Sequence, residues 1–179
     1  LDHAAELGAN TFQIFSASPR MWRSAPLDPE AVVRLKRERE RLDLTPLVVH
    51  DSYLVNMAAA DLGSRQRSVA AFRVEIERCL AMEAEYLVFH PGSYQGQSVE
   101  QGIATLAASL VEAARGLEST HLMLLLENTA GSGCALGSRF EELAAIRNAA
   151  QPRMDLAVGF CLDTAHCLAA GYDVASEAD

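Results

Sequence analysis

Four residues of types that bind metal ions follow short apolar runs at nearly regular intervals: His50, His90, Glu127 and Asp163. The intervals between them are 40, 37 and 36 residues. Side chains at the carboxyl ends of parallel strands are where α/β folds keep their chemistry. Two histidines and two carboxylates in such positions therefore predict a metal site. Imidazole and carboxylate ligands together suit zinc, with manganese or iron as alternatives.

The segment Asp163-Thr-Ala-His166 is the sharpest of these signals. Its two ligand-type residues are three apart at a predicted strand exit, so both can project toward one site. Glu127 ends the most apolar run of the chain, where an unpaired carboxylate would be costly to bury. No Lys or Arg lies between Arg115 and Arg139. The competing interpretations are a distant arginine partner for Glu127 and a loop hydrogen bond for His50.

The elements that would position these residues repeat along the chain. Apolar runs at 11–15, 47–50, 86–90, 122–127 and 158–163 recur with the spacing of βα units, which take about 30 or more residues each. Four of the runs lack alternation, which predicts parallel strands covered on both faces. Three intervening segments carry helix-start signals, at Asp28-Pro29, Ser98-Val-Glu-Gln101 and Ser138-Arg-Phe-Glu141. Five strands fit either an open doubly wound sheet or part of a (β/α)8 barrel.

Length and composition predict one α/β domain over residues 1–179. Half of the residues are apolar and 22% are charged, which is typical of a globular protein. No apolar run reaches the roughly 18 residues of a membrane helix, and four scattered cysteines favour a reducing, cytoplasmic location. The net charge of −9 argues weakly against nucleic acid, but bound divalent cations would weaken that argument.

The order of the motifs resembles the endonuclease IV family of zinc-dependent apurinic/apyrimidinic endonucleases, which act in DNA base-excision repair. The resemblance rests on Phe-Gln-Ile-Phe15, Ser-Pro-Arg-Met-Trp22 and His-Asp-Ser-Tyr-Leu-Val-Asn56, then His-Pro-Gly-Ser93, Glu-Asn-Thr-Ala-Gly-Ser-Gly133 and Asp-Thr-Ala-His-Cys-Leu-Ala-Ala-Gly-Tyr-Asp173. It extends over essentially the whole chain. It implies hydrolysis of the DNA backbone 5′ to abasic sites in double-stranded DNA, by water that a metal activates.

The resemblance also implies roles for individual residues. His50, His90 and Glu127 match the ligands of one zinc ion, and Glu127 matches a ligand bridging to a second zinc, which makes it the expected catalytic residue. Asp163 matches a ligand of the second zinc and His166 one of a third. The residues expected to contact DNA at the damaged nucleotide are Arg20, Tyr53 and Leu54, for which loop packing is the alternative.

The implied fold is an incomplete TIM barrel, with about five consecutive parallel strands and outer helices. The first strand and the last two strands of the family have no counterpart in the 179 residues. Only the first zinc would have its full set of protein ligands, so activity of the chain alone is expected to be impaired. The alternatives are a xylose isomerase-like sugar isomerase or epimerase, and an inactive fragment. The sequence does not predict an oligomeric state.

Overall fold

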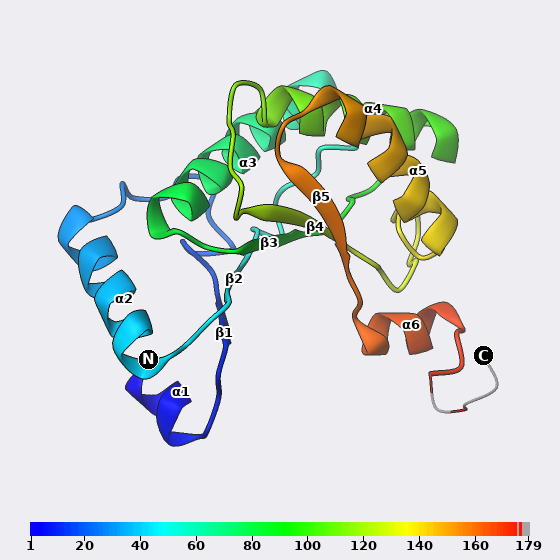
Figure 1. The fold of residues 1–179 in the computed structure, drawn as a ribbon. Coiled ribbons are helices and arrows are strands. Elements are labelled where there is room, and N and C mark those ends of the chain that lie inside the picture. The colour runs from blue at the N-terminus through cyan, green and yellow to red at the C-terminus, as the bar shows by residue number, and fades with distance from the viewer. Residues whose placement is uncertain (175, 177–179) are drawn as a thin grey trace.

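The computed structural model describes residues 1–174 and 176, and its centre is one parallel sheet (Figure 1). The strands lie in chain order and are β1 (Phe12–Ile14), β2 (Leu47–His50), β3 (Tyr86–Phe89), β4 (Met123–Glu127) and β5 (Ala157–Cys161). Every neighbouring pair is parallel. The expectation of five adjacent parallel strands is confirmed.

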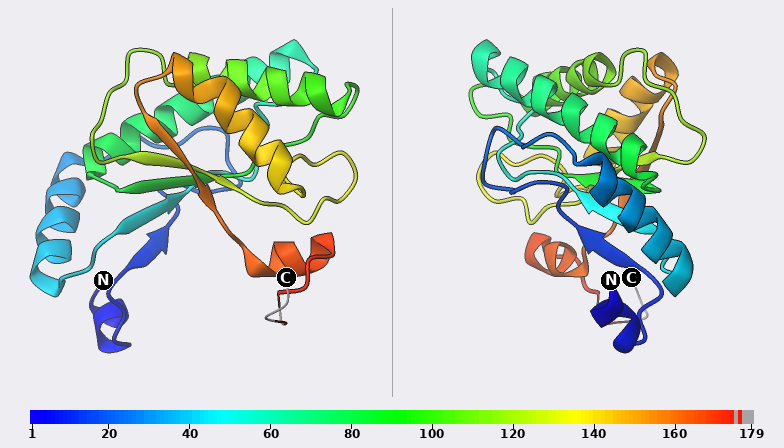
Figure 2. Two further views of the ribbon diagram at one scale, coloured as in Figure 1. Left: turned by 45° about the vertical axis from the view of Figure 1, so that its right-hand side comes forward. Right: turned by 90° about the vertical axis from the view of Figure 1, so that its left-hand side faces the viewer.

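The connections between the strands are helical, as their apolar spacing predicts. The helices are α1 (Asp2–Glu6), α2 (Pro29–Leu42), α3 (Leu62–Met82), α4 (Val99–Ala113), α5 (Phe140–Ala150) and α6 (Thr164–Ala170), with a 3-10 turn at Gln151–Arg153. Helices α2 to α5 contact one another in chain order. Figure 2 shows α3, α4 and α5 together on one face of the curved sheet. None of the helices described in the structure is long and apolar enough to cross a membrane.

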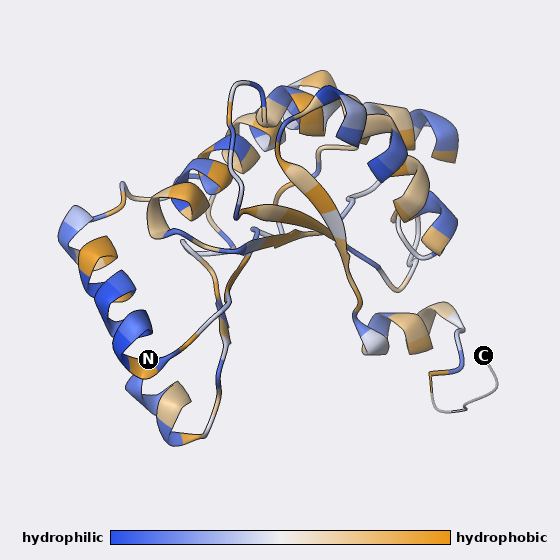
Figure 3. Cartoon of the chain, viewed as in Figure 1, coloured by the Kyte–Doolittle hydropathy of each residue, from blue (hydrophilic) through white to orange (hydrophobic). Residues whose placement is uncertain are grey.

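The main core lies between the sheet and this helical layer. Phe72 of α3 packs against Phe89 of β3 with ring centroids 4.8 Å apart, and both side chains are fully buried. The strands are mostly apolar in Figure 3, whereas the helices alternate between apolar and polar residues. The other face of the sheet is less covered than the apolar runs predict, because Leu125 is half-buried and Phe160 is 50% exposed.

Two of the three predicted helix starts are confirmed. Asp28 caps α2 through the amide of Glu30, and Ser98 forms a complete capping box with Gln101 at the start of α4. The capping box predicted at Ser138 is wrong. Helix α5 begins at Phe140, and Glu142 accepts a hydrogen bond from the amide of Gly137 (2.7 Å), so a different glutamate folds back over this helix start.

The strand register determines which strand ends come together. Phe89 pairs with Leu126, so the residues that follow them, His90 and Glu127, lie side by side at one edge of the sheet. In the described residues, β1 and β5 are the outer strands of this sheet. The arrangement is an arc of parallel strands with helices on its outer side, which is part of a TIM barrel.

Candidate metal centre

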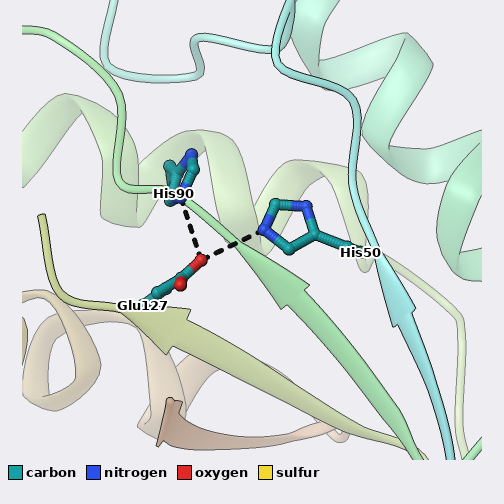
Figure 4. A group of neighbouring side chains, drawn as sticks. All are labelled: His50, His90 and Glu127. Carbon is teal, nitrogen blue, oxygen red and sulfur yellow. Dashed lines mark hydrogen bonds and ion pairs between the residues drawn. The ribbon is translucent and has the colours of Figure 1, made fainter. Parts of the chain in front are cut away.

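Three side chains from three neighbouring strands converge at the carboxyl edge of the sheet (Figure 4). His50 is the last residue of β2, His90 follows β3 directly, and Glu127 is the last residue of β4. Glu127 Oε2 lies 3.1 Å from His50 Nε2 and 2.9 Å from His90 Nε2. The expected convergence of these residues on one point is therefore observed, and the partners of the Glu127 carboxylate are histidines rather than a distant arginine.

The hydrogen bond on the far side of the His50 ring indicates that the site suits a cation. His50 Nδ1 lies 2.8 Å from the carbonyl oxygen of Asp51, which only accepts, so Nδ1 must carry a proton. The Nε2 atom then faces the Glu127 carboxylate with either a second proton or a lone pair directed at a metal ion. A backbone carbonyl that orients a histidine in this way is a common outer partner of metal ligands. The donor set therefore fits a metal.

The contacts among these side chains also shift the pKa values of Glu127 and His50. Burial alone would raise the pKa of Glu127, but hydrogen bonds with His50 and His90 outweigh burial and lower that pKa to about 2. Burial opposes the charged form of His50, yet the hydrogen bonds to Glu127 and to the Asp51 carbonyl raise the pKa of His50 above its ordinary value. The carboxylate is thus held ionised, as a metal ligand must be.

A second group shares Glu127 with the first. Ligand atoms of Glu127, Asp163 and His166 lie within 4.8 Å of one another, as do those of His50, His90 and Glu127. Asp163 lies just beyond β5, as the N-cap of α6, and its Oδ1 accepts from the amide of His166 (2.8 Å). The predicted neighbours are therefore close together, although Asp163 begins a helix instead of ending a strand.

Asn128 organises this second group, and the sequence analysis did not single it out. Its side chain donates to the Asp163 carbonyl (3.0 Å) and accepts from the Asp163 amide (2.6 Å). Its own carbonyl lies 2.8 Å from Nδ1 of His166, the ring nitrogen that also lies 3.8 Å from Asp163 Oδ2 and 4.0 Å from Glu127 Oε1. The signal available in the sequence was its position directly after Glu127.

Aromatic rings cover one side of the histidines. The Tyr53 ring stacks on His90 at 6.2 Å between centroids, and Phe15 lies 5.6 Å from Tyr53 and 5.5 Å from His50. A cavity of about 380 Å³ opens beside the group, with His50, His90 and His166 among its lining residues. The site is consequently an accessible hollow bordered by both imidazoles and aromatic rings.

Of the residues predicted to contact DNA, Tyr53 lines this hollow, whereas Arg20 and Leu54 lie outside its lining. Arg20 is exposed between β1 and α2, Tyr53 is 60% exposed between β2 and α3, and the adjacent Leu54 is half-buried. The two histidines outside the pattern, His3 and His121, are exposed and absent from both metal-ligand groups found in the described chain.

Sequence comparison assigns the fold to a known family. Residues 1–179 match the model of the family described as "Xylose isomerase-like TIM barrel". The chain therefore belongs to the xylose isomerase-like TIM barrel family. Within it, the chain is 55% identical to a protein of Solibacter usitatus named "Probable endonuclease 4", over 96% of this chain and 59% of that protein. It is 41% identical to "Endonuclease 4" of Thermus thermophilus, over 99% of this chain and 61% of that one.

Comparison of structures agrees with the sequence relationship. The crystal structure of endonuclease IV from Thermus thermophilus superposes with a TM-score of 0.81 at 39% identity, covering 98% of this chain and 60% of that chain. A D-tagatose 3-epimerase-like protein matches with a TM-score of 0.69 at 23% identity, a likeness of fold alone. The resemblance to endonuclease IV is thus confirmed. The chain spans about three fifths of the length of the curated relatives it matches.

Proposed function

We propose that these residues form part of a metal-dependent phosphodiesterase of the endonuclease IV type, which cleaves double-stranded DNA on the 5′ side of abasic sites. The observation that carries this proposal is the shared Glu127 carboxylate. It faces His50 and His90 on one side and the Asp163–His166 pair on the other. This arrangement occurs in a chain 55% identical to a probable endonuclease 4.

The two ligand groups would hold the metal ions that the reaction needs. His50, His90 and Glu127 would hold one zinc ion, and Glu127, Asp163 and His166 would contribute to further zinc sites, up to three in all. Manganese is the alternative ion. Bound divalent ions would supply an activated water nucleophile and neutralise charge on the phosphate and on the leaving oxygen. Glu127 acts as the catalytic residue of this chain because it belongs to both groups, and the Asn128 side chain fixes the position of Asp163.

The cavity beside the metal group suits an extrahelical sugar phosphate. Extrusion of a nucleotide costs least where a base is missing, since no pairing or full stacking is lost. Tyr53 lines the hollow, and Arg20, Tyr53 and Leu54 would contact the duplex at the lesion. DNA as the substrate is in line with the expected cytoplasmic location.

A segment graft tests the proposal. The matching segment of Thermus thermophilus endonuclease 4 is replaced by this chain, and the chimera is incubated with zinc and a duplex carrying one tetrahydrofuran abasic analogue. We expect incision 5′ to the analogue, inhibition by EDTA, and no cutting of the intact duplex. The Glu127→Gln chimera should be inactive, whereas the His121→Gln chimera should retain activity, because His121 lies outside both ligand groups.

Two results would count against this function. One is a folded chimera that binds zinc but leaves the abasic duplex uncut. The other is ketose–aldose isomerisation or epimerisation of a free sugar by that chimera, which would favour the sugar isomerase alternative.

A further inference from the structure

The segment between β1 and α2, which carries Arg20, has little backbone structure of its own. Residues 15–28 form neither helix nor strand. In this fully described segment, a single backbone hydrogen bond joins two of its residues, from the amide of Met21 to the carbonyl of Ser18 (3.2 Å). A cavity of about 310 Å³ lies beneath it, lined by Ser16, Trp22 and Glu75 among others. Phe15 packs near His50 and Tyr53, and Leu27 packs against the core, but a single local hydrogen bond does not account for the path between them.

Side chains from elsewhere hold this segment in place instead. Arg78 of α3 is 8% exposed, and its guanidinium contacts both ends of the segment. Nε donates to Ser16 Oγ (2.6 Å), Nη1 donates to the Ala25 carbonyl (2.9 Å), and Nη2 donates to the Ser16 carbonyl. The planar fork of an arginine can satisfy several such acceptors at fixed angles, which the single ammonium of lysine cannot reproduce.

Two weaker contacts act between these ends. Ser52 Oγ donates to the carbonyl of Pro19 (2.8 Å), the residue before Arg20. The guanidinium of Arg67 lies over the Trp22 ring at 5.4 Å from its centroid. Both Arg67 and Trp22 are exposed, so this cation–π contact is the weaker kind. Arg78 is therefore the buried anchor of the segment.

We propose that Arg78 is a positioning residue for DNA binding: by joining Ser16 to Ala25 it sets the path of the segment and thereby the position from which Arg20 contacts DNA. This inference rests on the proposed function. Arg78 touches neither the metal-ligand residues nor the cavity beside them. Its effect must pass through the segment, and its loss should weaken DNA binding without changing zinc binding.

The chain contains its own reporter and its own control. Trp22 is the only tryptophan, so tryptophan fluorescence, excited selectively over the four tyrosines, reports on this segment alone. Arg73, also on α3, donates to the carbonyls of Ala113 (3.1 Å) and Arg115 (2.9 Å), away from the segment. Arg73→Lys thus removes the same kind of contact elsewhere. Arg78→Lys keeps the positive charge near the buried Glu75, so its effect isolates hydrogen-bond geometry.

Acrylamide quenching of Trp22 is measured on the 179-residue chain. Binding of a fluorescein-labelled duplex with a tetrahydrofuran site is measured by anisotropy on the zinc-loaded chimera described above, which carries the same substitutions. In Arg78→Lys we expect stronger quenching and roughly three- to tenfold weaker binding of the abasic duplex, with unchanged zinc affinity. Arg73→Lys should match the parent chain in both measurements.

A double-mutant cycle separates positioning from general destabilisation. If Arg78 acts through Arg20, adding Arg78→Lys to Arg20→Ala should weaken DNA binding little further. Fully additive losses, or quenching equal to that of the parent, would overturn the inference. If the parent chimera does not prefer the abasic duplex, the proposed function fails and the DNA role of Arg78 fails with it. Quenching still decides separately whether Arg78 orders the segment.

Discussion

Glu127 is the residue on which the candidate site depends, because its carboxylate belongs to both ligand groups. It is buried, and its pKa of about 2 keeps it ionised well below neutral pH. The hydrogen bonds of the neighbouring histidines determine which of their ring nitrogens face this carboxylate. His50 has Nδ1 next to a backbone carbonyl and Nε2 facing Glu127, whereas His166 has Nδ1 next to both a backbone carbonyl and the two carboxylates of its group.

Replacing Glu127 should therefore weaken metal binding. Loss of an outer partner of a metal ligand typically lowers metal affinity about 10–100-fold. Glu127 is expected to be a ligand itself, so Glu127→Gln should lower the zinc affinity by more than about a hundredfold. Isothermal titration with zinc measures this affinity. His121→Gln, which changes an exposed histidine at the opposite end of β4, serves as the control. Equal zinc affinity in both variants would show that the group does not bind metal.

A different prediction concerns Arg20, whose side chain is exposed and is not needed for packing of the core. If it contacts DNA phosphate, Arg20→Ala should weaken binding of the abasic duplex and reduce the salt dependence of binding by about one unit of slope. The free energy of unfolding should change by no more than about 0.5 kcal/mol. Arg153→Ala, at an exposed arginine preceding β5, is the matched control. A large loss of stability in Arg20→Ala would instead favour the loop-packing interpretation.

At the scale of elements, the helices show how local signals succeed or fail. The sequences at Ser98 and Ser138 both match a capping box, yet only Ser98 forms one. At the start of α5, Glu142 reaches back to the Gly137 amide instead. Gly131 packs so closely on Ser138 that a Cβ at Gly131 would lie 2.6 Å from the Ser138 Cβ. The close packing of the loop before α5 thus prevents Ser138 from capping the helix as its sequence pattern predicts.

These two serines form a matched pair for measuring the cap. Ser98→Ala should destabilise the protein by about 1 kcal/mol, because the amide of Gln101 loses its acceptor at the start of α4. That loss corresponds to a fall of about 2–4 °C in melting temperature for a chain of this size. Ser138→Ala should have a smaller effect. Thermal unfolding followed by circular dichroism gives both values, and a larger shift for Ser138→Ala would contradict the cap assignment.

At the scale of the whole molecule, the curved sheet brings its loops together at one edge. The cavity beside the metal group is lined from the β2–α3, β3–α4 and β4–α5 connections and from His166 of α6. Asn56 links two of these connections, since it donates to the Ser93 carbonyl (3.2 Å) and accepts from the Ser93 amide (3.0 Å). A Cβ at Gly92 would lie 2.3 Å from Asn56 Oδ1, so only glycine allows this approach. The site depends on these cross-connections as much as on the strands.

The open sheet leads to a prediction about the 179-residue chain. Its outer strands β1 and β5 have unpaired edges in the described residues, and a sheet edge invites association with other chains. If the His50–His90–Glu127 set is the one zinc site with all its protein ligands, as the resemblance implies, the several-ion chemistry of the proposed function would be incomplete in this chain. We expect the isolated chain to bind zinc but to incise the abasic duplex no faster than background. We predict that the lack of incision results from the absence of the first strand and the last two strands of the barrel.

Comparison with the grafted chimera measures this directly, at equal protein and zinc concentrations. Sedimentation should also show concentration-dependent association of the isolated chain. Incision by the isolated chain at the rate of the chimera, abolished by EDTA, would show that these residues suffice for activity or assemble into a complete site.

The sequence by itself determined the strand order, the parallel pairing and the five ligand-type residues. Four of these residues follow the repeat: one ligand-type residue comes at or just after the end of each of β2 to β5, and parallel register places those strand ends at one edge. The tertiary structure alone decided the role of Asn128, the stacking of Tyr53 on His90, and the failure of the Ser138 cap. It also decided that Arg78 of α3 joins Ser16 to Ala25. Each of these contacts depends on the path of a loop that residues distant in the sequence hold in place, and no local pattern encodes such a path.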